Sequence, residues 1–248
     1  MKLFRKLSRL IPDRIYLQIV YFKHFRRFIN FNNPKTFNEK IQWLKLNYRN
    51  EEYTKLVDKY RVKQYITKLI GEEYVIPTLG VWNNVDDIDF KSLPEKFVLK
   101  CNNDSGGIVI CKNKKDFDEA KAKSFLKERL KNNGYWYGRE WPYRLKRVRG
   151  RSYKNVKPCI IAEKYMEDSI SKDIKDYKFF CFNGSMEFFD IDIDRFIEHR
   201  ANYYDRNGNF LPFGKKYCPP DYTKKIEIPK NLGKMIEFAE TISHNTVL

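Results

Sequence analysis

Long apolar runs are missing from this 248-residue sequence. The longest early run, Ile15 to Phe22, is interrupted by Gln18 and followed at once by Lys23. A membrane-spanning helix needs about 20 consecutive apolar residues, so we expect none. The basic start also lacks the apolar segment and the small-residue cleavage site of a signal peptide. We therefore expect a cytoplasmic protein.

Cysteine and histidine are scarce and scattered. The five cysteines are odd in number and show no CxxC spacing, which argues against a disulfide framework or a zinc site and favours reduced thiols. Three histidines are too few for a histidine-rich metal site. The cysteines are Cys101, Cys111, Cys159, Cys181 and Cys218, and the histidines are His24, His199 and His244.

Negative charge is under-represented. The chain has 49 Lys and Arg against 32 Asp and Glu, a formal charge of +17. Such a balance suits an anionic partner: nucleic acid, membrane headgroups, nucleotide phosphates or acidic glycans. A lysine-rich solvated surface explains it equally well, so charge alone does not choose. Hydrophobic residues, at 42%, are enough for a core.

The first segment, Met1 to Phe31, is basic and has apolar residues at helical spacing. Pro12 stands where a second helix would begin, and Ile15, Ile19 and Phe22 continue an apolar stripe. A basic amphipathic helix can pack on the body of a domain or lie on the inner face of an anionic membrane, and we favour packing. Thr36 and Glu39 have capping-box spacing ahead of a third helix.

The remaining pattern is one of helices and antiparallel hairpins. Asn183-Gly184, flanked by alternating apolar residues, is a strong hairpin signal. Strand–helix alternation is absent, which argues against a dinucleotide-binding fold and indicates an α+β class. We expect helices at Val57 to Ile70 (with Gly71 just past its end), Asp116 to Leu130 (capped by Asp116) and Asn231 to Ile242. We expect strands at Tyr74 to Val81, Phe97 to Lys100, Ile108 to Cys111, Cys159 to Met166, Asp176 to Phe182 and Ser185 to Asp194. A further hairpin is expected within Asn202 to Phe213, and a loop or irregular helix from Gly134 to Tyr153.

Three short features could bind a nucleotide, although none is a Walker or GxGxxG motif. Lys100 ends an apolar strand six residues before Gly106-Gly107, a spacing that suits phosphate oxygens and close backbone approach. Glu163-Lys164-Tyr165-Met166 follows an apolar strand and could offer backbone groups to a purine edge. Asp58-Lys59 lies on the helix expected at Val57 to Ile70, ahead of a glycine and a strand. Singly, each has a plainer interpretation: a turn, an edge strand and a solvated helix face.

Taken in order, these features resemble the TupA-like ATP-grasp family, found in gene clusters for teichuronopeptide and capsule. The similarity runs from about Asn33 to Asn231 and rests on PKTFNEKIQWLKL, VDKYRVKQYI, IGEEYVIPTLGVW, LPEKFVLKCNNDSGG, YGREWPY, KPCIIAEKYMED and DYKFFCFNG. It implies an ATP-grasp-like fold of two α+β lobes with antiparallel sheets, preceded by a helical segment. We expect that segment at 1–56, the lobe with the Gly-rich flap at 57–158, and a shortened C-terminal lobe at 159–248.

The resemblance also implies roles for particular residues. Lys59 and Lys100 match phosphate-binding lysines, and Ser105, Gly106 and Gly107 match a flap over the phosphates. Glu163, Lys164, Tyr165 and Met166 match the adenine hinge, with Glu167 or Asp168 near the ribose. Lys178, Arg195, His199 and Arg200 lie where the family places groups facing the triphosphate or the acceptor, and of these we assign Lys178, Arg195 and Arg200 as catalytic.

The implied activity is ATP-dependent joining of a carboxylate to an amine, with ATP and Mg²⁺ as cofactors. The acceptor would be a sugar acid or amino acid of a cell-surface polysaccharide, with possible association with membrane or assembly proteins. The family's Mg²⁺-holding acidic strands have no counterpart after Asn231, so we predict no metal ligands in this chain and leave its catalysis open. Asp190, Asp192 and Asp194 alternate along a predicted strand, and we expect them on a solvated face.

Two other functions stay open. One is a glycosyltransferase of the same pathway, although the sequence shows no clear DxD metal motif in a loop, and Asp190-Ile191-Asp192 falls in a predicted strand. The other is a basic nucleic-acid or membrane-surface binder, since aromatic and basic residues interleave between Tyr135 and Tyr153. A nucleic-acid role leaves the motif order unexplained, so we place it last.

Overall fold

The computed structural model describes residues 8–132, 134–148, 151–167, 175–193, 198–215, 217–224, 226–244 and 246. The chain forms two compact units, the first from 1–65 and 76–165 and the second from 66–75 and 166–248. The division into 1–56, 57–158 and 159–248 stays a prediction. No helix in the described part of the chain is both long and apolar enough to cross a membrane.

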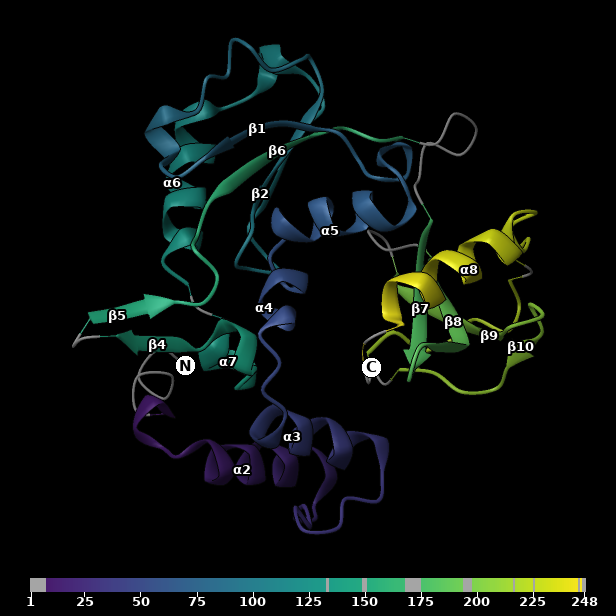
Figure 1. Cartoon of the computed structure of the whole chain (residues 1–248). Helices are drawn as coiled ribbons and strands as arrows, with labels where there is room; N and C mark the ends of the chain where they lie inside the picture. The colour runs from purple at the N-terminus through teal and green to yellow at the C-terminus, as the bar shows by residue number, and fades with distance from the viewer. Residues whose placement is uncertain are drawn as a thin grey trace. The chain divides into compact units, whose positions relative to one another are not determined.

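The first unit opens with helices that pack on one another (Figure 1). Leu17 and Tyr21 of one helix are buried with Ile29 and Phe31, which confirms the packed arrangement for that side of it. The predicted capping box is present: Thr36 accepts from the Glu39 backbone, and Glu39 accepts from Thr36 N at 2.9 Å. The elements are η1 (Ser8–Leu10), α2 (Asp13–Phe25), α3 (Phe37–Asn47) and α4 (Glu52–Leu56).

A four-stranded antiparallel sheet forms the body of this unit, in the order β1-β6-β2-β3. Phe97, Leu99 and Cys101 alternate inward along β2, and Leu126 of helix α6 joins them in the core. The strands are β1 (Thr78–Trp82), β2 (Phe97–Cys101), β3 (Ile108–Cys111) and β6 (Ile160–Lys164), with α6 (Glu119–Leu130), η3 (Val85–Asp87) and η4 (Lys114–Asp116). Four strands are thus confirmed close to their predicted positions.

Several predicted bounds are wrong. The helix expected from Val57 begins only at α5 (Arg61–Ile70), because the side chain of Asp58 accepts from Tyr60 N and Arg61 N and makes a turn there. Asp118, not Asp116, caps α6 by accepting from Lys121 N.

Two further segments differ from their predicted form. The strand expected from Tyr74 is preceded by η2 (Glu72–Tyr74). The segment expected to be a loop contains α7 (Tyr135–Gly138), η5 (Trp141–Tyr143) and the paired strands β4 (Leu145–Val148) and β5 (Arg151–Lys154). Strand pairing across a two-residue connection is not visible in a basic, aromatic sequence with no apolar alternation.

The second unit is an antiparallel meander covered by a helix (Figure 1). Its strands run β10-β9-β8-β7, and Asn183 and Gly184 make the predicted hairpin turn with φ of 52° and 81°. Phe189 and Ile191 pack with Ile236 of the helix. The elements are β7 (Asp176–Phe182), β8 (Ser185–Ile193), β9 (Arg200–Asp205), β10 (Phe210–Leu211) and α8 (Leu232–Ser243).

Segment 66–75 also belongs to the second unit. The Tyr74 ring lies 4.5 Å from the Phe238 ring of α8, edge to face. The amino group of Lys234 lies over both rings, 5.1 Å and 5.2 Å from their centres. Aromatic and cation–π contacts therefore attach this short segment to α8.

Candidate functional site

A buried carboxylate with two lysines lies at the centre of the first unit's sheet. Glu163 in β6 is 4% exposed and stands in register with Val98 of β2. Lys100 is two residues further along β2 on the same face, so the two side chains are diagonal neighbours. Lys100 Nζ lies 2.5 Å from Glu163 Oε2, and Lys63 Nζ of α5 lies 2.7 Å from Oε1.

The ion pairs decide the charge of Glu163. Burial alone would raise the pKa of Glu163, but hydrogen bonds and charges from Lys100 and Lys63 outweigh it and hold the pKa below its ordinary value. Glu163 is therefore ionised at neutral pH, and the three groups together carry one net positive charge. A cluster with surplus positive charge in a partly buried place suits an anion such as a phosphate.

Lys59 adds a third ammonium beside this cluster. Its Nζ donates to the carbonyl of Asp104 at 2.7 Å, and its backbone N–H points to the carbonyl of Asn102. Burial lowers the pKa of Lys59, Asp104 opposes this, and the charge of Lys100 lowers it further. The ammonium groups of Lys59 and Lys100 therefore repel each other electrostatically. The structure brings together Lys59, Lys100 and Glu163, which sequence reasoning linked to one nucleotide.

The Ser-Gly-Gly turn has an anchored base and an exposed tip. Asp104 accepts from Gly106 N at 3.0 Å and is gripped by Arg129, whose Nη2 lies 2.8 Å and Nε 2.6 Å from its two oxygens. Gly107 is buried at the other end, while Ser105 and Gly106 are exposed. A side chain on Gly107 would bring a Cβ within 2.8 Å of the Cys101 Cβ, so the turn needs glycine there.

Asn102 joins the pieces of this site. Its side-chain nitrogen donates to Asp58 at 3.0 Å and to the carbonyl of Lys157 at 2.9 Å, and its oxygen accepts from Cys159 N at 2.8 Å. The turn before α5, the start of the flap and the entry to β6 are therefore held by one amide. These hydrogen bonds fix the backbone next to Lys59 and Lys100, and the side chains of the two lysines take no part in them.

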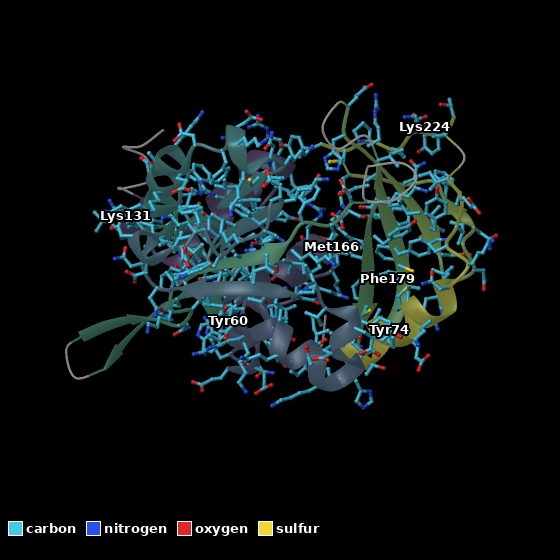
Figure 2. All side chains as sticks on the ribbon, turned by 90° about the horizontal axis from the view of Figure 1, so that it is seen from above. Tyr60, Tyr74, Lys131, Met166, Phe179 and Lys224 are labelled. Carbon is cyan, nitrogen blue, oxygen red and sulfur yellow. The ribbon has the colours of Figure 1, made fainter. Side chains whose placement is uncertain are left out.

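The predicted hinge continues from β6. Lys164 N donates to the carbonyl of Pro77 at 3.0 Å, and Lys96 Nζ lies 5.9 Å from the centre of the Tyr165 ring. Met166 follows and is 42% exposed (labelled in Figure 2). Asp168 and Arg195 lie outside the described residues.

A second charged cluster occupies the sheet of the second unit. Lys178 of β7 pairs with Asp192 of β8 and lies 3.0 Å from Asp176 and 3.7 Å from Asp190. Lys215 pairs with Asp190. Asp190 is fully buried and Asp192 is 6% exposed. The expectation of solvated aspartates is therefore wrong for these two, because neighbouring strands cover them and lysines neutralise them, while Asp194 lies outside the described residues.

His199 extends this cluster. Its Nε2 lies 3.2 Å from Asp192 Oδ1, and its Nδ1 lies 3.2 Å from the sulfur of Cys218. Burial would raise the pKa of Asp192, but hydrogen bonds from Lys178 and His199 outweigh it and keep the pKa low. Arg200 pairs instead with Glu198, so the structure joins Lys178 to the aspartates and not Arg200.

The described residues do not present a shell for Mg²⁺. No group of three or more His, Cys, Asp or Glu side chains in the described part of the chain is placed to hold a metal. Asp190 and Asp192 are already engaged by lysines, whereas Mg²⁺ needs oxygen ligands free to face it. We therefore derive no step through a protein-held metal.

Sequence reasoning missed several residues that build these sites. Lys63 follows Lys59 by four positions, a helical spacing that could have suggested a shared direction. Asn102, Asp104 and Arg129 carry no such signal, because their partners lie up to 57 residues away. Lys215 was missed for the same reason.

Two antiparallel α+β units, one with lysines gathered beside a Gly-rich turn, are consistent with an ATP-grasp type of fold. A family model described as TupA-like ATPgrasp matches residues 39–247, and the chain belongs to this family. Neither a curated protein nor a solved structure matches the chain. The family membership confirms the resemblance and the fold class, while the roles of individual residues stay predictions.

Proposed function

We propose that this chain binds ATP in its first unit and uses it to join a carboxylate to an amine in the assembly of a cell-surface polysaccharide. Family membership supports the ATP part of this proposal. The observation that carries it further is the meeting of Lys59, Lys100 and Glu163 beside the turn at Gly107.

In the proposed nucleotide site, Lys100 exchanges a carboxylate partner for a phosphate. Lys100 is held by Glu163 at 2.5 Å, and it can turn its ammonium to a phosphate oxygen while Lys63 keeps Glu163 neutralised. The exposed backbone of Ser105 and Gly106 would then cover the phosphates, since its base is fixed by Asp104 and Arg129. We assign the backbone of Lys164 and Tyr165, with Met166, to the adenine edge, and Asp168 to the ribose.

The reaction would proceed in two steps. A carboxylate oxygen of the acceptor attacks the γ-phosphorus of ATP, and the bond to the β,γ-bridging oxygen breaks, releasing ADP and leaving an acyl phosphate. The amine then attacks the acyl carbon, and inorganic phosphate leaves with the bonding electron pair. Catalysis of this kind is mostly positioning and charge stabilisation, for which we propose Lys178, Arg195 and Arg200. ATP would arrive as its Mg²⁺ complex, the ion neutralising phosphate charge.

Calorimetric titration with ATP and Mg²⁺ tests the nucleotide site. We expect Lys100→Ala to weaken ATP binding about 10- to 100-fold, the value of a hydrogen bond to a charged group. Lys112→Ala is the matched control, since Lys112 is exposed one residue after β3. Circular dichroism checks that both variants fold.

Two results would overturn this proposal. One is wild-type affinity for ATP in Lys100→Ala. The other is heat of binding with nucleotide sugars and none with ATP, which would favour the glycosyltransferase. If ATP binds, release of ADP and phosphate with candidate sugar-acid or amino-acid acceptors tests the ligase step.

A further inference from the structure

Helix α2 has two apolar faces, and the residues that the structure describes pack on one of them. Leu17 and Tyr21 are each 3% exposed and belong to the small core with Ile29 and Phe31. Ile15, Ile19 and Phe22 are 53%, 47% and 38% exposed. At about 100° per residue, these three lie in one stripe on the side away from Leu17 and Tyr21.

The exposed stripe continues past the end of the helix. Arg26 ends α2 in the left-handed conformation, with φ of 56°, and the chain turns back. This turn stacks the Phe28 ring on the Phe22 ring, with centres 4.8 Å apart and planes 22° apart. Phe28 is 67% exposed. We name Ile15, Ile19, Phe22 and Phe28 the outer face of α2.

Basic residues far outnumber acidic ones in the segment that carries the outer face. From Ser8 to Lys35 the sequence has six Lys and Arg and a single acidic residue, Asp13. Asp13 is already engaged, because Arg139 Nε lies 3.3 Å from its Oδ1 and Tyr135 donates to its Oδ2. Lys23 and Arg26 are exposed beside the stripe.

The combination of exposed hydrocarbon and basic charge selects the partner. A nucleic acid offers phosphates but no apolar layer for Ile15, Ile19 and the stacked phenylalanines. A bilayer with anionic headgroups offers both within a few ångströms of depth. The opposite side of α2 is held in the protein by Leu17 and Tyr21, which leaves the helix able to lie flat on such a surface.

We propose that the outer face of α2 docks on an anionic lipid bilayer, with its apolar side chains at the acyl boundary and Lys23 and Arg26 among the headgroups. This inference goes beyond the proposed nucleotide function and does not depend on it.

Vesicle sedimentation of the full chain tests the docking. Phosphatidylcholine vesicles with and without phosphatidylglycerol are compared, and we expect binding that needs the anionic lipid and weakens with salt. The double variant Ile19→Ser, Phe22→Ser should bind the anionic vesicles at least about tenfold less, even at low salt, because the apolar contribution is lost. In the double variant Lys23→Glu, Arg26→Glu, adding phosphatidylglycerol to the vesicles should no longer increase binding.

The control variant is Leu69→Ser, Ile110→Ser, which removes two apolar side chains of similar exposure, 39% and 46%, outside α2. It should bind vesicles as the wild type does. Circular dichroism shows whether each variant is folded.

Three results would overturn the docking proposal. One is no vesicle binding by the wild type. Another is equal loss in the α2 and control variants. The third is that the outer face binds another partner while vesicles remain unbound. That partner would be an oligonucleotide, or a second copy of the chain seen by light scattering, and its binding would be lost in Ile19→Ser, Phe22→Ser.

Discussion

Glu163 shows how one residue organises the nucleotide site. A carboxylate that is 4% exposed would be costly without partners, and Lys63 and Lys100 supply two. The same ion pairs hold Lys100 in place before any ligand arrives. Because one lysine is sufficient to neutralise the carboxylate, the other is available to an incoming phosphate.

Glu163→Gln should lower the free energy of unfolding by about 3 kcal/mol at pH 7, because it leaves two partly buried lysines without their carboxylate. The folded-state pKa of Glu163 lies below its ordinary value of 4.5. Its stabilising contribution is therefore fully present above that value and is lost as the pH falls through the folded-state pKa.

Urea unfolding of wild type and variant at neutral pH and at roughly pH 3 measures this. The difference between them should shrink at the acid end. Glu128→Gln, at an exposed position of α6, is the control and should change little. A difference between wild type and Glu163→Gln that is the same at both pH values would contradict the ionised, ion-paired carboxylate.

At the scale of single elements, short-range chemistry sets where several helices and turns begin. Thr36 caps α3 reciprocally with Glu39, and the hydrogen bonds that Glu39 accepts from Thr36 and Lys35 lower its pKa. Asn183 and Gly184 make the β7–β8 turn with positive φ, which L-residues other than Asn, Asp and Gly seldom adopt. Asp58 marks a break between two helices, because its carboxylate makes the turn that separates α4 from α5.

Thr36→Ala should destabilise the protein by about 1 kcal/mol, because the backbone N–H of Glu39 loses its acceptor at the start of α3. Thr36→Ser keeps the hydroxyl and should cost only a small part of this. Urea unfolding followed by circular dichroism measures both. Equal losses in the two variants would show that the methyl group, and not the cap, matters at this position.

On the scale of the whole molecule, each unit has a core of its own. Phe97 and Leu99 of β2 pack with Leu126 of α6 in the first unit. Phe189 and Ile191 of β8 pack with Ile236 of α8 in the second. A cavity in one core should therefore act first on the sheet that contains it.

Phe97→Ala and Phe189→Ala each remove a side chain that is fully buried, at an expected cost of about 3–5 kcal/mol. Hydrogen exchange followed by peptide mass spectrometry should show lost protection in β1, β6, β2 and β3 for Phe97→Ala. For Phe189→Ala the loss should fall in β7, β8, β9 and α8. Uniform loss over both units in either variant would mean that the two cores do not respond separately.

Local features and family were accessible from the sequence, because they depend on residues a few positions apart or on ordered motifs. The capping box at Thr36, the turn at Asn183-Gly184 and most strands were predicted in this way, as was membership of the TupA-like ATP-grasp family. The pairing of β4 with β5 was not, since no periodic pattern indicates it.

Only the tertiary structure decided which side chains meet and which are covered. Lys63 reaches Glu163 across 100 residues of sequence, and the buried Asp190 meets Lys178 of β7 and Lys215. The tertiary packing likewise buries Leu17 and Tyr21 of α2 and leaves Ile15, Ile19 and Phe22 exposed. Burial and ion pairing are properties of contacts between distant segments, and no local pattern in the chain encodes which apolar face will find a partner.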